Sequence, residues 1–416
     1  MRIIFANKFY YLKGGAERYM FDLAGQLNRF GHEIVPFAMR DDRNVKTSWS
    51  RNFVSAVRTE RVSFGWQGLR TAGRLLYSFE ARRRFRRLLH EARPDVLHVH
   101  NIYHQLSPSF LPIIREQGLP TVMTAHDYSL IAPNYSLYHD GAICEITKPD
   151  RFWRAVGHRC VKGSRAASAL EALEFSLHRA LGLYMKNLDV IIAPSRFMQA
   201  TLVEYGVPED LIVHIPHPVT TEGRMVSSGG KYALFVGRLS PEKGADVLLR
   251  AAVKAPKVPV KIVGTGPEEG KLKALAKKLK LSNVEFLGFR QGAELEAAYA
   301  GAAFVVVPSV WYEVAGLVAL EAYAHGKPVI ASQIGGLAEA VEDGETGLCV
   351  SAGDADGLAE RMRQLWAEPK AAQEMGRAAR AYVEREHDPE THASRILWAY
   401  ELAKERSKAV RQIQER

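Results

Sequence analysis

Glu313-Val-Ala-Gly-Leu-Val-Ala-Leu-Glu321 is the most informative stretch of this chain. The apolar run before it, Phe304 to Val307, is typical of a buried parallel strand. Apolar residues at helical spacing follow, and they predict a helix that begins near Ala315 or Gly316. A second apolar run, Val329 to Ala331, comes after that helix. The pattern therefore predicts a strand–helix–strand unit, the building block of a parallel sheet.

The start of this predicted helix is suited to binding an anion. Free backbone N–H groups and a positive dipole end suit a phosphate or pyrophosphate. Glu313 lies in the loop before the helix, and Glu321 lies two turns into it, about 12 Å away at a rise of 1.5 Å per residue. Two carboxylates around an anion-binding helix end can hold the two hydroxylated ends of a nucleotide-sugar. The alternative is an ordinary solvated pair of glutamates, because short motifs also occur by chance.

The Glu-x7-Glu spacing after a strand, with Gly-Leu-Val inside it, resembles the signature of the family 4 retaining glycosyltransferases. The resemblance implies an α/β chain with the GT-B fold, in which two Rossmann-like, doubly wound domains face each other across a deep crevice. It covers essentially the whole chain and is strongest from Val236 to Leu348. One position departs from the family pattern, because Ala315 stands where Glu-x-Phe-Gly has its Phe. That loss of bulk would widen the sugar pocket or alter its specificity.

Length and composition suit two globular domains. The chain has 416 residues, of which 47% are hydrophobic and 25% are charged. No run approaches the roughly 18 apolar residues of a membrane span, and the residues after Met1 read as a strand, too short for a signal peptide. From the fold we expect residues 1–219 with 389–416 to form an acceptor-side domain, since the last helix crosses back. Residues 220–388 would form the donor domain.

The cysteines indicate a reducing compartment. Three are present, Cys144, Cys160 and Cys349, and their wide spacing argues against a disulfide framework and fits the cytoplasm. The first two are too few for a zinc site, so we predict no metal. The resemblance implies no bound cofactor, only a nucleotide diphosphate-sugar as substrate, with UDP or GDP as the expected nucleotide.

The net charge of +10 is unevenly distributed. The segment Arg58 to Arg93 contains ten arginines and three glutamates, and residues Leu69 to Leu89 within it read as one helix. A basic, partly amphipathic stretch can hold anionic lipid head groups. It therefore suggests peripheral attachment to the inner face of the cell membrane and a lipid-linked acceptor. The alternative is a solvated helix face. We do not expect nucleic acid as a partner, because no recognised binding module accompanies the charge.

The first half opens with a strand-like run, Ile3 to Ala6, followed by a glycine turn and a helix pattern that ends at Gly31. In a doubly wound sheet the ligand lies at the carboxyl edge of such a strand. The family places this loop against the donor phosphates. The resemblance therefore implies that Gly15 contacts the donor while Gly14 shapes the turn.

Two later strand-like runs end in histidine, at His100 and at His126. Strand-end histidines in this topology face the crevice, and the resemblance places His126 against the donor sugar. The alternative is a structural histidine bonded to a neighbouring backbone group, which we favour for His100 only. The irregular segment Tyr128 to Lys162 lies beside the crevice and is a candidate acceptor loop, because long irregular segments are usually functional or mobile.

The second half begins with Gly237-Arg238-Leu-Ser-Pro-Glu-Lys243-Gly244 after a strand. Arginine binds phosphate with two parallel hydrogen bonds, and lysine adds a flexible point charge. The stretch matches the family's Gly-Arg…Glu-Lys-Gly pattern, in which both cations hold the donor diphosphate. The resemblance therefore gives that role to Arg238 and Lys243, against the alternative of two surface cations on a turn.

A glycine-rich turn, Gly264-Thr-Gly266-Pro-Glu-Glu-Gly270, invites a dinucleotide-binding interpretation. Its spacing is G-x-G-x-x-x-G, and no acidic residue ends the next strand, so the dinucleotide fingerprint is incomplete. In the family this turn and the next line the nucleobase pocket. The resemblance therefore adds Gly264, Gly266 and Phe289 to the expected donor site.

Together these residues imply transfer of a hexose-type sugar from a nucleotide diphosphate to a hydroxyl with retained configuration. Arg238 and Lys243 would neutralise the leaving diphosphate, Glu313 would orient the sugar, and Glu321 would bind the ribose. The backbone donors at the helix start come from four residues: Ala315, Gly316, Leu317 and Val318. The acceptor would attack on the leaving-group face, so we assign no protein nucleophile.

Three other classes of protein stay open. Nucleotide-sugar 2-epimerases share this fold and would alter the sugar without an acceptor. A dinucleotide-dependent oxidoreductase is disfavoured by the glycine spacing. A catalytically silent binding subunit is disfavoured because Arg238, Lys243, Glu313 and Glu321 are all present.

Overall fold

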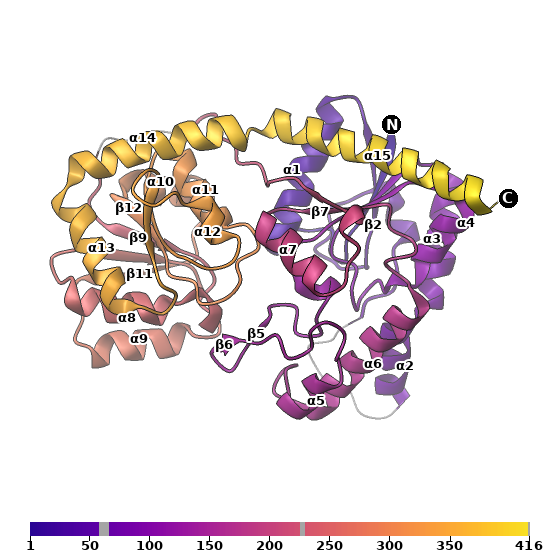
Figure 1. Ribbon diagram of the computed structural model, residues 1–416, viewed down its shortest axis with the longest axis horizontal. Helices are drawn as coiled ribbons and strands as arrows, with labels where there is room; N and C mark the ends of the chain where they lie inside the picture. Colours follow the sequence, from indigo (N-terminus) through magenta and orange to yellow (C-terminus); the bar gives the residue numbers. More distant parts are fainter. Residues whose placement is uncertain (58–65, 225–228, 415–416) are drawn as a thin grey trace.

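The computed structural model describes residues 1–57, 66–224 and 229–414. It contains two separate six-stranded parallel sheets, each flanked by helices, which lie side by side (Figure 1). The continuous apolar runs of the sequence become strands that are buried on both faces, as parallel sheets require. The predicted α/β class with two doubly wound sheets is confirmed.

The first sheet has the order β2-β1-β3-β4-β7-β8. Alternate residues of β1 face opposite cores, with Ile3 and Phe5 on one side and Ile4 and Ala6 on the other. A small antiparallel hairpin extends from this half toward the other (Figure 1). The strands and helices of this half are β1 (Arg2–Ala6), α1 (Gly15–Arg29), β2 (Glu33–Phe37), α2 (Trp66–Leu76), α3 (Phe79–Ala92), β3 (Val96–Val99), α4 (Leu111–Gln117), β4 (Thr121–Thr124), β5 (Tyr138–His139), β6 (Ala142–Ile143), α5 (Arg154–His158), α6 (Arg165–Leu181), β7 (Val190–Ala193), α7 (Arg196–Glu204) and β8 (Ile212–His214).

The second sheet has the order β11-β10-β9-β12-β13-β14, which places the first strand of this half next to the fourth. In such sheets the loops at this reversal of strand order form the ligand crevice. The elements are β9 (Ala233–Val236), α8 (Ala245–Lys254), β10 (Val260–Val263), α9 (Glu269–Lys278), β11 (Val284–Gly288), α10 (Ala293–Gly301), β12 (Phe304–Val307), α11 (Leu317–Ala324), β13 (Val329–Ser332), α12 (Leu337–Ala340), β14 (Gly347–Val350), α13 (Ala355–Ala367), α14 (Pro369–Glu386) and α15 (Pro389–Gln414).

The last two helices join the halves. Helix α14 covers the second sheet, and α15 continues along the top of the first (Figure 1). In α15, Ile396, Ala399 and Tyr400 pack into the core beside β1, and the Tyr400 hydroxyl lies 2.8 Å from Nδ1 of His98. None of the described helices has the length and apolarity that a membrane crossing needs. The domain limits at residues 219 and 389 stay a prediction.

Two local expectations differ from the structure. The helix after Glu313 begins at Leu317, one residue later than expected, because Gly316 caps it in the left-handed conformation. The helix expected over residues 69–89 is two helices, α2 and α3. The break falls at Ser78, whose Oγ accepts a hydrogen bond from the amide of Ala81 and so starts α3 as an N-cap.

Candidate functional site

A cleft of about 3270 Å³ lies between the two sheets and is lined by loops that follow their strands. All fourteen residues predicted for the site line it: Gly14, Gly15, His126, Arg238, Lys243, Gly264, Gly266, Phe289, Glu313, Ala315, Gly316, Leu317, Val318 and Glu321. They come from six separate segments, each of which follows a strand. The parallel sheets bring them together because the carboxyl ends of all strands in a sheet meet at one edge.

Arg238 is exposed on the second-half wall of the cleft. Its guanidinium makes no ion pair with any residue in the described part of the chain. A guanidinium in this state can donate two parallel hydrogen bonds to a phosphate without first breaking a salt bridge.

Two glycines hold the loop of Arg238 in place. The backbone amides of Gly237 and Leu239, on either side of it, donate to carbonyls of the β10 strand and loop. A Cβ on Gly264, whose φ is +138°, would lie 1.8 Å from the carbonyl oxygen of Gly237. A Cβ on Gly266 would lie 2.3 Å from the carbonyl oxygen of Leu239. Both positions therefore require glycine for close packing of the two loops, whatever they contact in a ligand.

Lys243 and Glu313 form an ion pair at the centre of this wall. Nζ of Lys243 lies 2.6 Å from Oε1 of Glu313, and the hydroxyl of Ser309 donates to the same oxygen at 2.6 Å. Burial by itself raises the pKa of Glu313, but the charge of Lys243 and these two hydrogen bonds outweigh it and hold the pKa below its usual value. Glu313 is therefore a charged carboxylate, and it lines the cleft.

The start of α11 meets the glycine turn of the first half. A Cβ on Gly15 would lie 3.6 Å from Cδ1 of Leu317, so these predicted donor-binding segments are neighbours across the cleft. Glu321, one turn further along α11, accepts a hydrogen bond from the Tyr299 hydroxyl at 2.8 Å and lies 3.9 Å from a guanidinium nitrogen of Arg18 in α1. The free N–H groups at the start of α11 and this carboxylate thus border the same space.

His126 is bound by the other strand-end histidine. Nε2 of His126 lies 3.0 Å from Nδ1 of His100, and the two rings are stacked. Burial lowers the pKa of both histidines well below 6.5, so both rings are neutral. His100 is fully buried, as a structural histidine should be, but its partner is the His126 ring and not a backbone group. Nδ1 of His126 is the nitrogen that remains for a ligand.

Phe289 is 62% exposed at the edge of the cleft, where a flat ring can stack on a nucleobase.

Several cleft residues were not predicted individually, among them Tyr135, Glu171 and His217. Tyr135 belongs to the irregular segment that we expected beside the crevice. No local pattern distinguishes the other two from ordinary helix and loop residues.

One group of potential metal ligands occurs in the described ranges. His104, Glu171 and Glu174 place ligand atoms within 4.8 Å of one another. However, the two ring nitrogens of His104 each face a different carboxylate. The arrangement suits hydrogen bonds through the imidazole as well as it suits an ion. The prediction that no metal is bound stays a prediction.

Comparison with known proteins identifies the family of this chain. Residues 13–222 match Glycosyltransferase Family 4, and residues 224–382 match Glycosyl transferases group 1. The chain belongs to glycosyltransferase family 4. Glycogen synthase of Mycobacterium tuberculosis (strain CDC 1551 / Oshkosh) is 30% identical over 298 residues, which span 68% of this chain and 69% of that protein.

Two more comparisons extend this assignment. D-inositol 3-phosphate glycosyltransferase of Mycobacterium sp. (strain KMS) is 32% identical over 278 residues, 65% of this family 4 glycosyltransferase and 58% of that protein. Among solved structures, Anabaena HepE in complex with UDP and glucose superposes with a TM-score of 0.66 at 20% identity, over 95% of this chain and 98% of HepE. The predicted GT-B fold of this glycosyltransferase is thereby confirmed.

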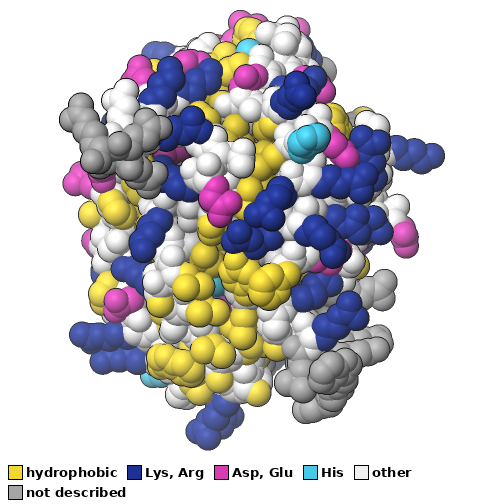
Figure 2. All heavy atoms as spheres, turned by 90° about the vertical axis from the view of Figure 1, so that its right-hand side faces the viewer, with side chains coloured by type: hydrophobic (Ala, Val, Ile, Leu, Met, Phe, Trp, Pro, Cys, Tyr) yellow, Lys and Arg dark blue, Asp and Glu magenta, His cyan; other side chains and the backbone are white. Residues whose placement is uncertain are grey.

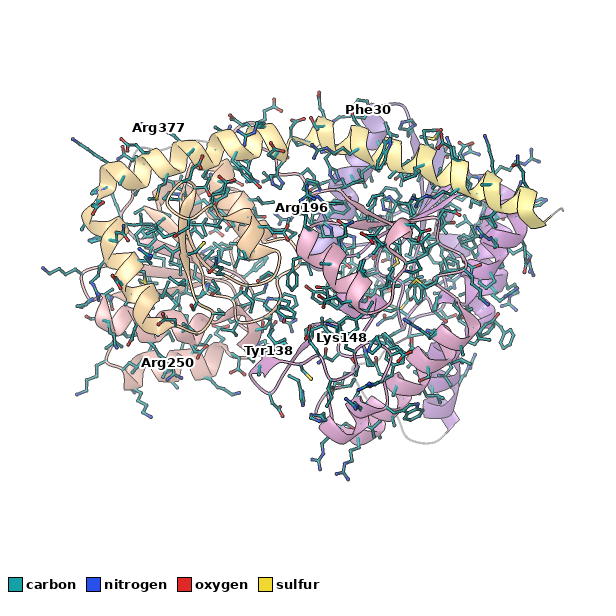
Figure 3. All side chains as sticks on the ribbon, in the orientation of Figure 1. Phe30, Tyr138, Lys148, Arg196, Arg250 and Arg377 are labelled. Atoms are coloured by element: carbon teal, nitrogen blue, oxygen red, sulfur yellow. The ribbon has the colours of Figure 1, made fainter. Side chains whose placement is uncertain are left out.

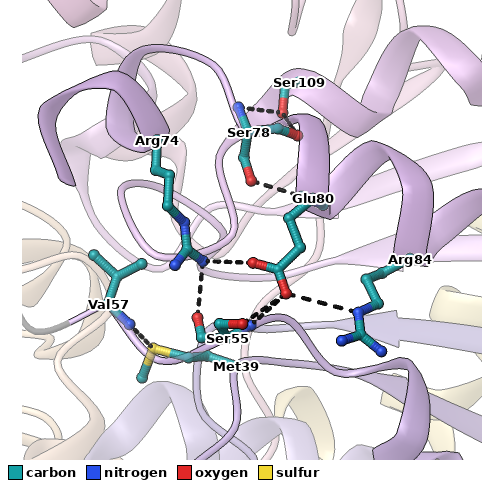
Figure 4. A network of polar contacts seen from close by, with 9 residues as sticks. Met39, Ser55, Val57, Arg74, Ser78, Glu80, Arg84 and Ser109 are labelled. Carbon is teal, nitrogen blue, oxygen red and sulfur yellow. Dashed lines mark hydrogen bonds and ion pairs between the residues drawn. The ribbon is translucent and has the colours of Figure 1, made fainter. Parts of the chain in front are cut away.

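The basic segment of this glycosyltransferase has two kinds of arginine. Residues 58–65 lie outside the described part of the chain. In the remainder, Glu80 is surrounded by Arg74, Arg84 and Ser55, which join α2, α3 and a cleft loop (Figure 4). Arg82 likewise donates to the Tyr77 hydroxyl. These inward arginines are structural.

The outward arginines of α3 are Arg83, Arg86 and Arg87. Their end of the molecule shows Lys and Arg side chains gathered around an apolar strip (Figure 2). Only these three of the α3 arginines can meet a second surface without giving up buried contacts.

Proposed function

We propose that the protein is a retaining glycosyltransferase that moves a hexose from UDP-hexose, or as second choice GDP-hexose, to a hydroxyl acceptor during assembly of a cell-surface polysaccharide or glycolipid. The observation that carries this proposal is the Arg238 guanidinium, which has no ion pair among the described residues and lines one cleft with the Lys243–Glu313 pair and the start of α11. HepE, a structural neighbour, was solved with UDP and glucose, which supports the choice of base and sugar class.

Each group has a role as the sugar–phosphate bond breaks. Arg238 and the N–H groups at the start of α11 stabilise charge that develops on the diphosphate, and fixed donors of this kind supply the largest catalytic effects. Glu313 accepts hydrogen bonds from sugar hydroxyls and Glu321 from the ribose. Nδ1 of His126 contacts the sugar from the opposite wall. The departing diphosphate takes the acceptor's proton, so the front-face attack retains the configuration.

The test is nucleotide release from a panel of UDP-, GDP- and ADP-hexoses, with the sugar product analysed by NMR. We expect slow hydrolysis of one UDP-hexose to free hexose of unchanged configuration at the anomeric carbon. Release of nucleotide together with a sugar epimerised at C2 would show that the protein is a nucleotide-sugar 2-epimerase and not a transferase. Binding of NAD-type cofactors, with no nucleotide released from any sugar donor, would contradict it altogether.

We further propose that α3 attaches the enzyme to anionic membrane, which would bring a lipid-linked acceptor to the cleft. Each basic residue near such a surface contributes about 1 kcal/mol to binding. Replacing Arg83, Arg86 and Arg87 with Gln should therefore lower binding to vesicles of equal parts phosphatidylcholine and phosphatidylglycerol by about 10²-fold. Vesicle flotation measures this directly.

The matched control carries the same charge change elsewhere. Lys271, Lys273 and Lys277 are exposed on α9 of the second half, and their triple Gln variant should float as the wild type does. Equal loss in both triple variants would show that binding follows net charge alone. If the α3 variant floated as fully as the wild type, α3 would not bind the membrane and would be an ordinary solvated helix.

A further inference from the structure

The first-half wall of the cleft holds a row of linked ionisable side chains that the donor site does not use. Oε1 of Glu171 lies 3.3 Å from Nε2 of His104, and Nδ1 of His104 lies 3.1 Å from Oε2 of Glu174. Glu174 is almost completely buried, so it anchors the row, and Glu171 lines the cleft. The backbone of His104 has φ = +62°, a conformation that is uncommon for residues other than glycine.

The same wall carries oxygen atoms without partners. Oε2 of Glu171, Oε1 of Gln105 and Oδ1 of Asn134 are buried atoms with no hydrogen-bond partner among the described residues. All three side chains line the cleft. Buried polar atoms in proteins are nearly always hydrogen-bonded. These three acceptor atoms belong to side chains that line the cleft, so a rotation toward the cleft would let a ligand bring donors to them.

An aromatic platform lies beside these oxygens. Tyr135, next to Asn134, is 52% exposed and stacks on Tyr103, with ring centroids 6.4 Å apart. Tyr103, next to His104, is fixed by its hydroxyl, which donates to Asp127 at 2.5 Å. A sugar ring has a face of apolar C–H groups and hydroxyls around its edge. The exposed aromatic ring suits that face, and the neighbouring oxygens suit the hydroxyls.

This wall is close to the expected reaction centre. Tyr135 lies near enough to Arg238 and Glu242 of the second half for their charges to act on its hydroxyl. The β5–β6 hairpin that follows Tyr135 reaches the second half, with Tyr138 at that end (Figure 3). A ligand on Tyr135 would therefore lie beside the donor diphosphate.

We propose that Glu171, Gln105, Asn134 and Tyr135 form the acceptor subsite, and that it takes an uncharged polyhydroxylated ring, a sugar or a cyclitol. The ring stacks on Tyr135, and its hydroxyl groups donate to the three unpartnered oxygens once their side chains turn toward the cleft. His104 is a positioning residue, because the buried Glu174 holds its Nδ1 and its Nε2 holds the Glu171 carboxyl. This inference rests on the proposed glycosyl transfer.

The charges on this wall disfavour an anionic ring. A phosphate or carboxylate at the subsite would meet the carboxyl groups of Glu171 and Asp127. Of the cations nearby, Lys8 is held with Nζ 3.6 Å from the centroid of the Tyr103 ring, and burial lowers its pKa to about 8. An anion would face the carboxyl groups of Glu171 and Asp127 as well as the cations Lys8 and Lys162, whereas neutral hydroxyls satisfy all three oxygens.

The test compares hydrolysis with transfer, using the donor found by nucleotide release. The acceptors are p-nitrophenyl α-glucoside, α-mannoside and β-galactoside, with p-nitrophenyl glucuronide as the charged analogue. We expect Glu171→Gln and Tyr135→Ala each to raise KM for a neutral glycoside by about tenfold or more, as the loss of one good contact should. Nucleotide release in water is measured in parallel, so that weaker acceptor binding is separated from weaker use of the donor. Glu401→Gln, an exposed glutamate on α15, is the control.

A pH profile separates binding from a structural role. Burial, together with the charge of Glu174, raises the pKa of Glu171 to about 7, against the charges of His104, Lys162 and Lys8. Because the carboxylate is the better acceptor of hydroxyl hydrogens, the wild-type KM for the glycoside should fall as pH rises through about 7. In Glu171→Gln that dependence should be absent.

The possible outcomes are distinguishable. Unchanged KM in both variants would overturn the subsite, and Tyr135→Ala keeps this test valid if Glu171→Gln does not fold, since Tyr135 is exposed. Preference for the glucuronide, or hydrolysis without transfer to any neutral glycoside, would overturn the uncharged class. A wild type that releases no nucleotide from any donor would instead refute the proposed function.

Discussion

Arg238→Ala should lower kcat/KM for nucleotide release from the donor by about 10³-fold, the largest single loss we expect. The guanidinium has no ion pair within the described residues, so its charge is available to the leaving diphosphate. Its removal deletes two directed hydrogen bonds where negative charge develops. Steady-state nucleotide release measures the effect. Arg238→Lys keeps the charge without the two-pronged geometry and should recover only part of the rate.

The control for this variant is Arg250→Ala. Arg250 lies on α8, exposed away from the cleft, and pairs with Asp246 one turn earlier (Figure 3). Its variant should retain wild-type turnover and thermal stability. If Arg238→Ala retained most of the activity while Arg250→Ala also did, the diphosphate would have to lie elsewhere in the cleft.

Lys243→Met should have the second-largest effect, because it acts on catalysis and on stability. Loss of the charge should lower turnover by about 10²-fold. It also leaves the Glu313 carboxylate, which is 9% exposed, without its cation. Removing one partner of a buried pair destabilises a protein by about 3 kcal/mol. Methionine keeps a long side chain beside Trp311, whose ring centroid lies 4.9 Å from Nζ of Lys243.

The double variant Lys243→Met/Glu313→Gln separates the two effects. Glutamine still accepts the hydrogen bond from Ser309 but carries no charge, so thermal stability should return toward the wild type while activity stays low. A double variant as unstable as the single one would mean that the pair itself, and not the stranded carboxylate, determines stability.

The Lys243–Glu313 pair should also make the stability of the protein depend on pH in the acid range. Lys243 holds the pKa of Glu313 in the folded protein below 4.5, its value in the unfolded chain. The pair therefore stabilises the folded state at pH values above 4.5. This stabilisation is lost as the pH falls through the pKa of Glu313 in the folded protein. In Lys243→Met, burial raises the pKa of Glu313 against only the hydrogen bonds from Ser309 and Trp311.

Several parts of the site could be predicted because they depend on short motifs. Arg238 and Lys243 are five residues apart in one loop, and Glu313 and Glu321 flank one helix start. The resemblance supplied their roles, and the fold places them all in one cleft. The break in the basic helix was missed, because Ser78 caps α3 inside a run that has otherwise good helical spacing.

The sequence alone determined the two parallel sheets and the candidate donor-binding residues, since apolar periodicity and motif spacing are properties of neighbouring residues. Only the tertiary structure decided which side chains are partners. Lys243 and Glu313 are 70 positions apart, and His104 and Glu171 are 67 apart, so their contacts depend on where separate loops meet. The same holds for the unpartnered oxygens of the proposed acceptor wall. Hydrogen-bond partners and burial arise from the packing of distant segments, which no local pattern records.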